Sequence, residues 1–200
     1  MEIVLATRNK GKVRELQRIF AITLPQVQLL GTDNFPELHD VEETEDSFEG
    51  NALLKARAVS LFTNLPAIAD DSGLAVDHLG GAPGIFSARY SGVHGDDQAN
   101  LEKVLQEMVG VANRRAQFIC AAAFVAPRGY EKVVRAEMVG VLIDHARGKN
   151  GFGYDPIFIP EGHTETTGEM APELKDSISH RGKAMRELAA VISSELEKWV

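Results

Sequence analysis

The sequence predicts an α/β fold in which helices flank an elongated mixed β-sheet. Short apolar runs alternate with segments of helical periodicity in the first half of the chain, an order typical of α/β domains. Two long extended runs follow, at residues 116–126 and 131–143, and the turn residues Pro127–Tyr130 between them indicate a β-hairpin. We therefore expect one domain over residues 1–200, in which the hairpin contributes to a second lobe.

The first strand is expected at Glu2–Ala6 and the first helix at about Lys12–Phe20. Apolar residues recur at helical spacing along this helix, at Val13, Leu16, Ile19 and Phe20. Its charged residues are expected to face elsewhere, and they are Arg14, Glu15 and Arg18. The loop between strand and helix therefore ends at a helix N-terminus.

That loop is basic and polar, and it consists of Thr7, Arg8, Asn9, Lys10, Gly11 and Lys12. Because a helix start leaves backbone N–H groups unpaired and carries partial positive charge, the loop is suited to hold phosphate oxygens. It differs from a Walker loop, since the first glycine is missing and Val13 follows Lys12. The alternative is an ordinary βα turn with a solvated basic helix entry.

A second strand is expected at Val27–Leu30, followed by an acidic loop at residues 42–46 and a helix that Ser47 can cap. The helix has one apolar stripe, formed by Phe48, Ala52, Ala56, Val59 and Phe62. Asn51 and Lys55 lie four residues apart at the margin of that stripe, where they can face a cleft. The alternative for Lys55 is a solvated lysine whose stem covers apolar surface.

The apolar stretch Leu65–Ala69 runs directly into Asp70, Asp71, Ser72 and Gly73, so a buried strand is expected to end in two adjacent carboxylates. Like charges placed close together are costly unless a cation or a proton offsets them. Together with the basic loop, the pair indicates a metal ion and a phosphate chain. Leu74–Val76 is expected to form another strand.

A further helix is expected near Asp97–Met108, with Asp96 or Asp97 as its cap. Farther along the chain, Phe152 stands between two glycines, where its ring can stack on a base or belong to the core. Lys175 and Ser179–Arg181 lead into a last helix. The apolar side of that helix is formed by Met185, Leu188, Ala189, Ile192 and Leu196.

The composition narrows the classes of function. With 29 acidic against 21 basic side chains the net charge is -8, which disfavours nucleic acid as a partner. Cys120 lies in an apolar run and is expected to be a buried, inert thiol. The six histidines lack zinc-site spacing, whereas Mg²⁺ held by carboxylates and phosphates fits the acidic residues. We expect a cytoplasmic protein without a membrane partner, since no basic leader or membrane-length apolar stretch is found.

Several motifs occur together along the chain: Ala6-Thr7, Asn9, Lys12 and Glu15; Glu42-Glu43-Thr44; Asn51-Ala52 with Lys55-Ala56; Ala69-Asp70-Asp71-Ser72-Gly73-Leu74; Gly84 with Ser87-Ala88-Arg89-Tyr90; Gly151-Phe152-Gly153-Tyr154-Asp155-Pro156; and Ser179-His180-Arg181. In this order they resemble the inosine triphosphate pyrophosphatase (HAM1-like) family over nearly the whole chain. The resemblance implies two lobes with a central nucleotide-binding cleft. It also implies a homodimeric, magnesium-dependent enzyme that converts ITP, dITP or XTP to the monophosphate and pyrophosphate.

The resemblance further implies roles for individual residues. Asp71 would be the proton acceptor and, with Glu42, would hold Mg²⁺. The triphosphate would be contacted by Thr7, Arg8, Asn9, Lys10, Gly11 and Lys12, and the phosphates or ribose by Lys55 and Ser72. The nucleoside side of the site would be formed by Phe152, Gly153, Tyr154, Asp155, Lys175, His180 and Arg181. Hydrogen-bond donors from His180 and Arg181 are expected to favour a 6-oxo base over adenine.

Three alternatives stay open at this point. A Maf-like pyrophosphatase would act on modified pyrimidine nucleotides, although the Phe152–Asp155 and Ser179–Arg181 motifs favour a purine. A nucleotide sensor without turnover would gain little from Glu42, Asp70 and Asp71, because extra negative charge repels a polyanion unless a metal is bound. A serine hydrolase using Ser72 would need a histidine base, and none is close to it in sequence.

Overall fold

The computed structural model describes residues 1–195. Its strands and α-helices, in chain order, are β1 (Glu2–Leu5), α1 (Lys10–Thr23), β2 (Gln28–Gly31), α2 (Phe48–Thr63), β3 (Ala67–Val76), α3 (Asp97–Glu107), β4 (Arg115–Val125), β5 (Glu131–Leu142), β6 (Phe158–Pro160), α4 (Pro172–Ile178) and α5 (His180–Ser194). Short 3-10 helices span η1 (Thr32–Asn34), η2 (Asp77–Leu79), η3 (Gly84–Arg89) and η4 (Asp155–Ile157).

Within the described residues the strands form one six-stranded sheet in the order β2-β1-β3-β4-β5-β6. Strand β1 pairs in parallel with both β2 and β3, and Val4 lies opposite Ala67. Strand β5 pairs with β6 in the antiparallel direction. The mixed sheet with flanking helices confirms the α/β fold expected from the sequence.

The chain divides into two compact units. Unit 1 contains Met1–Asp71, Cys120–Ala136 and the chain from Arg181 onward, and unit 2 contains Ser72–Ile119 and Glu137–His180. Strands β3, β4 and β5 each contribute a segment to both units. Asp71 is the last residue of the first segment of unit 1, so Asp70 and Asp71 both belong to that unit.

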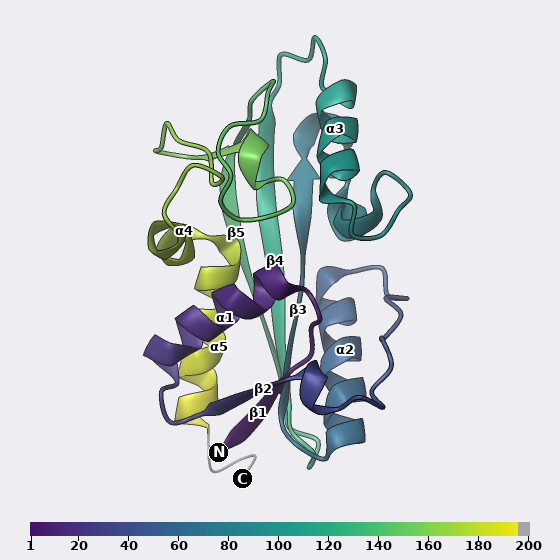
Figure 1. The fold of residues 1–200 in the computed structure, drawn as a ribbon, viewed down its shortest axis with the longest axis vertical. Coiled ribbons are helices and arrows are strands. Elements are labelled where there is room, and N and C mark those ends of the chain that lie inside the picture. Colours follow the sequence, from purple (N-terminus) through teal and green to yellow (C-terminus); the bar gives the residue numbers. More distant parts are fainter. Residues whose placement is uncertain (196–200) are drawn as a thin grey trace. The chain divides into compact units, whose positions relative to one another are not determined.

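Unit 1 has a hydrophobic core on one face of its strands. It joins α1 and α5, which lie side by side in Figure 1, to β1, β3 and β4. Its members include Ile3, Leu5, Leu16, Phe20, Ile68, Phe124, Met185 and Leu188. Helix α2 flanks β3 on the other side, where it buries Ala52, Ala56 and Val59. The first part of the sheet is therefore covered by helices on both faces.

Unit 2 has a separate core between α3 and its own segments of β3, β4 and β5. Apolar residues at helical spacing on α3 enter this core, namely Leu101 and Val104, followed by Met108. They join Leu74 and Val76 of β3, Phe118 of β4, Met138 of β5 and Phe158 of β6. The rings of Phe118 and Phe158 lie 4.7 Å apart, centroid to centroid.

Most of the expected elements are confirmed, with ends shifted by a few residues. The side chain of Ser47 accepts a hydrogen bond from the Gly50 N–H and caps α2, and Asp96 caps α3 through the Ala99 N–H. Strands β4 and β5 are neighbours in the sheet and are joined by a short turn, as the hairpin prediction required. Leu196, expected on the apolar side of α5, lies outside the described residues.

Cys120 is fully buried, as expected, and burial raises the pKa of its thiol to about 12. Burial therefore keeps this cysteine in its protonated, unreactive form.

Among residues 1–195, no helix combines the length and apolar character needed to cross a bilayer.

Two expectations about α2 and β3 are wrong. Phe62 was expected on the apolar stripe of α2, but it lies in the last turn of the helix and is 50% exposed. Strand β3 does not end at the two aspartates: it runs without interruption from Ala67 through Asp70 and Asp71 to Val76, so Leu74–Val76 is not another strand. The strand can continue because cations offset both carboxylates within the sheet.

The core of unit 1 predicts a large difference between two phenylalanines. Phe124→Ala leaves a cavity in a fully buried position and should lower the free energy of unfolding by about 3–5 kcal/mol, measured by urea denaturation. Phe62→Ala removes the same atoms from a half-exposed position and should cost far less, roughly 0.5 kcal/mol. Equal losses for the two variants would contradict the assignment of this core.

Candidate active site

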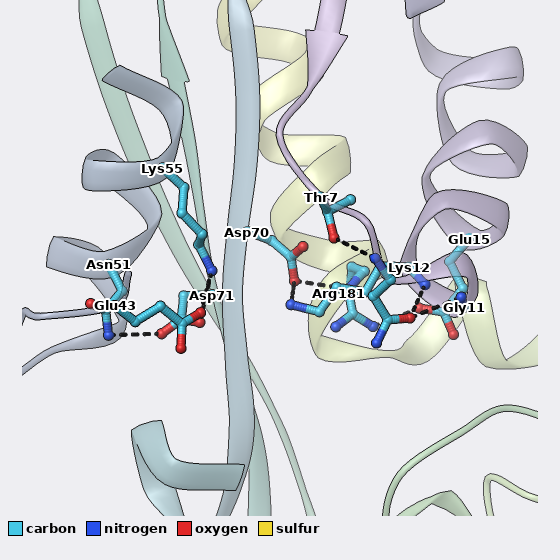
Figure 2. Close-up of polar contacts among 11 residues, drawn as sticks. Thr7, Gly11, Lys12, Glu15, Glu43, Asn51, Lys55, Asp70, Asp71 and Arg181 are labelled. Atoms are coloured by element: carbon cyan, nitrogen blue, oxygen red, sulfur yellow. Dashed lines mark hydrogen bonds and ion pairs between the residues drawn. The ribbon is translucent and has the colours of Figure 1, made fainter. Parts of the chain in front are cut away.

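Strand β3 directs two consecutive aspartates to opposite faces of the sheet. Successive side chains of a strand alternate between faces, so Asp70 shares its face with Ile68, and Asp71 shares the other face with Ala69. Figure 2 shows Asp70 on the side of α1 and α5, and Asp71 on the side of α2. The two carboxylates are therefore separated by the strand itself and have different surroundings.

Asp71 lies in a cluster with Lys55, Glu43 and Asn51. The Lys55 Nζ is 3.1 Å from Asp71 Oδ1 and 2.8 Å from Glu43 Oε1, so one ammonium bridges two carboxylates. Asn51, one turn before Lys55 on α2, donates from Nδ2 to Asp71 Oδ2 at 3.4 Å. The two side chains that contact Asp71 thus come from α2, and Glu43 of the acidic loop joins the cluster through Lys55.

Asn51 also explains why the acidic loop comes close to Asp71. Its Oδ1 accepts a hydrogen bond of 3.0 Å from the Glu45 N–H, which ties the loop to the first turn of α2. This bond fixes the chain two residues after Glu43, whose carboxylate then reaches Lys55. Asn51 is fully buried, so the oxygen and the nitrogen of its side-chain amide both bond to other groups of the protein.

Burial and neighbouring charges act in opposite directions on this cluster. Burial, reinforced by the charge of Glu43, raises the pKa of Asp71 above its ordinary value, although Lys55 and Lys12 oppose the shift. Burial alone would lower the pKa of Lys55, but the carboxylates of Asp71, Glu43 and Asp70 outweigh it and raise that pKa. Lys55 therefore stays charged, and Asp71 is a carboxylate with enhanced affinity for a proton.

Asp70 belongs to a second cluster on the opposite face. Its Oδ2 lies 3.0 Å from Lys12 Nζ and 3.1 Å from Arg181 Nε. The Arg181 guanidinium also reaches Glu15, with Nη1 2.6 Å from Oε2. Glu15 is 4% exposed, which corrects the expectation that it faces away from the buried side of α1. We call these four residues, Lys12, Glu15, Asp70 and Arg181, the charge quartet.

The quartet keeps Asp70 ionised. Burial would raise the pKa of Asp70, but Lys12, Arg181 and Lys55 together hold it well below its ordinary value. The pKa of Arg181 is in turn raised by Asp70 and Glu15 against the effect of its burial. Two adjacent aspartates thus have pKa values shifted in opposite directions, an arrangement that separates a permanent anion from a proton acceptor.

The loop before α1 is shorter than expected, because Lys10, Gly11 and Lys12 already form the first turn of the helix. Side chains of the loop itself organise this entry. Asn9 Oδ1 accepts hydrogen bonds from the backbone N–H groups of Gly11, at 2.8 Å, and Lys12, at 3.1 Å. Thr7 Oγ1 accepts from the Asn9 N–H at 3.2 Å. Arg8 instead contacts a neighbouring loop, with Nε 2.5 Å from Asp40 Oδ1 and a further bond to the Leu38 carbonyl.

Unit 2 contains a second set of the predicted residues, arranged around Asp155. The Lys175 Nζ lies 2.5 Å from Asp155 Oδ2, which also accepts from the Phe152 N–H at 2.8 Å. Thr167 Oγ1 donates to Asp155 Oδ1 at 2.8 Å. The Lys175 ammonium lies 5.0 Å from the centroid of the Phe152 ring. Asp155 thus holds both the aromatic loop and the lysine in place.

Gly151 is required for this arrangement. It has a positive φ of 75°, and a Cβ added to it would come within 2.0 Å of Asp155 Oδ2. A side chain at this position would therefore push the Asp155 carboxylate away from Phe152 and Lys175.

Other predicted residues of unit 2 also have defined neighbours. The Tyr154 hydroxyl donates to the Ser87 carbonyl at 2.8 Å, and the Gly153 N–H donates to Asp97 Oδ2 at 2.9 Å. The His180 ring is stacked on Phe118, with centroids 4.8 Å apart. Ser72 follows Asp71 directly on β3 and belongs to unit 2.

The structure brings some predicted residues together and adds others. Lys10 and Glu42 are exposed, and the side chain of the acidic loop that contacts Lys55 is that of Glu43. Glu15 was not proposed as a site residue, although its spacing of three from Lys12 puts both on one side of α1. Glu43 carried no sequence signal that separates it from Glu42.

The Asp71 cluster suits a hard cation. Carboxylate oxygens are the ligands that Mg²⁺ prefers, and Asp71 and Glu43 already share one cation, the Lys55 ammonium. Within residues 1–195, no group of three or more His, Cys, Asp or Glu side chains is arranged to hold a metal ion. A bound Mg²⁺ would therefore take part of its shell from water and substrate phosphates, as is usual for this ion.

Comparisons with known proteins show what the chain is similar to. The model of the Ham1 family matches residues 3–191. A dITP/XTP pyrophosphatase from Streptomyces avermitilis is 53% identical over 192 residues, which cover 95% of this chain and 96% of that protein. The solved structure of the Staphylococcus aureus Ham1 protein has a TM-score of 0.87 at 40% identity and covers 98% of this chain and 100% of its own. That of a nucleoside-triphosphatase / dITP/XTP pyrophosphatase from Mycobacterium abscessus has a TM-score of 0.75 at 46% identity and covers 94% and 98%.

The lowered pKa of Asp70 predicts how stability changes with acidity. Its folded-state pKa lies below the unfolded value of about 3.9, so the unfolded state takes up the proton first and stability is lost as the pH falls below that value. The free energy of unfolding should therefore fall more steeply in the native protein than in Asp70→Asn, by up to about 1.4 kcal/mol per pH unit. Urea denaturation from pH 6 to pH 3 measures both slopes, and parallel curves would contradict a charged, buried Asp70.

Proposed function

The chain belongs to the Ham1 family, and we propose that it hydrolyses the non-standard purine nucleoside triphosphates dITP, ITP and XTP to the nucleoside monophosphate and pyrophosphate. The observation that carries this proposal is the Asp71–Lys55–Glu43 cluster, which combines a proton-accepting carboxylate with a cation in a buried setting. We further propose that the protein acts as a homodimer, as the family resemblance implies.

Asp71 is the proposed proton acceptor. Its raised pKa makes it a stronger base than an ordinary aspartate, and the Asn51 and Lys55 contacts fix both of its oxygens. In the proposed reaction a water oxygen attacks the α-phosphorus while its proton passes to Asp71. The bond between the α-phosphorus and the bridging oxygen breaks, and pyrophosphate leaves with that electron pair.

Positive charge is needed to bring a triphosphate near these acids. Lys12 and Lys55 each contribute an ammonium, and the remaining loop residues Thr7–Gly11 are the proposed phosphate contacts at the start of α1. Because Asn9 already caps the Gly11 and Lys12 N–H groups, binding through those amides would require Asn9 to release them. The lysine ammonium groups are the more direct phosphate contacts.

Mg²⁺ is the proposed cofactor. Asp71 and the acidic segment Glu42–Glu43 would hold the ion. The carboxylate oxygens of Asp71 and Glu43 are of the type that Mg²⁺ prefers, and both already contact one cation, the Lys55 ammonium. When bound, the ion neutralises phosphate charge and makes the leaving pyrophosphate more stable. Lys55 contributes positive charge in the same place and keeps the two carboxylates from repelling each other.

For the nucleoside, we propose the residues of unit 2 that surround Asp155, together with Ser72. The Phe152 ring offers a face on which a base can stack, and Lys175 and His180 are the proposed polar contacts. A 6-oxo base presents an acceptor where adenine presents a donor, so a donor in the site separates the two classes. Asp155 and Tyr154 contribute by holding this surface in shape.

A panel of nucleoside triphosphates tests the proposed function. We expect pyrophosphate release from dITP, ITP and XTP in the presence of magnesium chloride, and a rate on ATP that is lower by about ten- to a hundredfold for each mismatched contact. EDTA should abolish the reaction. Release of orthophosphate instead of pyrophosphate, or equal rates with pyrimidine triphosphates, would reject the proposal.

Asp71→Asn tests the proton acceptor. The amide keeps the shape of the carboxylate but cannot take a proton at neutral pH, so kcat should fall by about 100- to 10,000-fold while the protein stays folded. Asp144→Asn removes the same charge from a side chain that is 84% exposed and should leave kcat unchanged. A folded Asp71→Asn variant with native turnover would show that another group accepts the proton.

A further inference from the structure

We propose that Thr167 is a positioning residue for nucleoside recognition: its hydroxyl fixes the Asp155 carboxylate, which in turn places the Lys175 ammonium and the Phe152 ring. This inference rests on the proposed function, because Lys175 and Phe152 are proposed nucleoside contacts. Thr167 acts through Asp155 and is not itself a nucleotide contact.

The first support is how the contacts are divided between the two oxygens of Asp155. Oδ2 accepts from the Phe152 N–H at 2.8 Å and lies 2.5 Å from Lys175 Nζ. Oδ1 accepts from Thr167 Oγ1 at 2.8 Å. A carboxylate turns readily about its last torsion, whose energy wells are broad, so a donor that holds Oδ1 also sets the direction of Oδ2. The Thr167 hydroxyl therefore bears on both contacts of Oδ2.

The second support is that both proposed nucleoside contacts depend on the same oxygen. Asp155 Oδ2 holds Lys175 through an ion pair and Phe152 through its backbone N–H. The lysine ammonium in turn lies 5.0 Å from the centroid of the phenylalanine ring. A rotation of the carboxylate would therefore displace the ammonium and the stacking face together. These residues and Thr167 all belong to unit 2, so the chain of contacts lies within one compact unit.

The third support is that Thr167 is itself held firmly. It is fully buried, and its N–H donates to the Phe158 carbonyl of β6 at 2.9 Å. The N–H of the next residue, Gly168, donates to the Asp155 carbonyl at 3.0 Å. A Cβ added to Gly168 would come within 2.9 Å of Pro156 Cα, so the two segments are in close contact. Because threonine is β-branched and stiff at χ1, a fixed backbone also fixes its hydroxyl.

The fourth support is the burial of the ion pair. The side chains of Lys175 and Asp155 are only 5% and 3% exposed. A buried ion pair is favourable only when further hydrogen bonds satisfy its remaining polar atoms. Thr167 supplies one of these bonds, to Asp155 Oδ1. Without the hydroxyl, a buried carboxylate oxygen loses a donor, and turning the carboxylate is the simplest way to recover one.

Thr167→Val tests the inference, because valine keeps the shape of threonine and lacks the hydroxyl. Binding is measured by calorimetry in magnesium chloride, with Asp71→Asn as the background so that the nucleotide stays intact. The affinity for ITP should fall by about tenfold, since an unmatched polar group or a misplaced binding group has effects of this order. The affinity for inorganic triphosphate should not change, because that ligand has no base.

Three further variants keep the test decisive. Thr167→Ser retains the hydroxyl and should retain the native affinity for ITP. Thr164→Val makes the same exchange at an exposed position of the same loop and should leave ITP binding unchanged. If Thr167→Val fails to fold, Thr167→Ala removes the hydroxyl without placing a methyl group against the carboxylate, and it carries the same prediction.

Three results would overturn the inference. One is a variant without the Thr167 hydroxyl that melts at a lower temperature but binds ITP with native affinity, as expected for a purely structural threonine. Another is an equal loss of affinity for ITP and for inorganic triphosphate. The last is a Thr167→Ser variant that binds ITP as weakly as Thr167→Val. Native protein that neither binds ITP nor releases pyrophosphate from it would instead reject the proposed function itself.

Discussion

The candidate site depends on the alternation of side chains along a β-strand. Two consecutive aspartates inside one buried strand must lie on opposite faces, and each then needs its own cation. Lys55 serves Asp71 on one face, and Lys12 with Arg181 serves Asp70 on the other. The sheet thereby separates two like charges that are adjacent in sequence, and β3 continues through them without a turn.

The same separation gives the two carboxylates different chemistry. Lys12 and Arg181 both contact one oxygen of Asp70, and its pKa lies well below the ordinary value. Asp70 therefore remains an anion that these two cations surround. Asp71 shares a single ammonium with Glu43 and has a raised pKa. Environment, rather than residue type, therefore decides which aspartate is suited to accept a proton.

Sequence patterns predicted what depends on neighbours along the chain. The periodicity of α1 and α2, the caps Ser47 and Asp96 and the β4–β5 hairpin all follow from local spacing. They could not show that Glu15 is buried, since its partner Arg181 is 166 residues away. Nor could sequence patterns show that Glu43, rather than Glu42, contacts Lys55. The hydrogen bond from the Glu45 N–H to Asn51, which fixes the position of the acidic loop, forms only in the folded chain. The two aspartates were misread as a strand end for the same reason.

The contacts of Arg181 also bear on how the protein is made. Arg181 is 166 residues from Glu15 and 111 from Asp70, so both acids leave the ribosome's exit tunnel long before this counter-ion does. Until then, two acids destined for the interior lack the guanidinium that they share, and the region around the first helix cannot close stably. The contacts around the first helix are therefore complete only after the last of these three residues has been translated, 166 residues after the first.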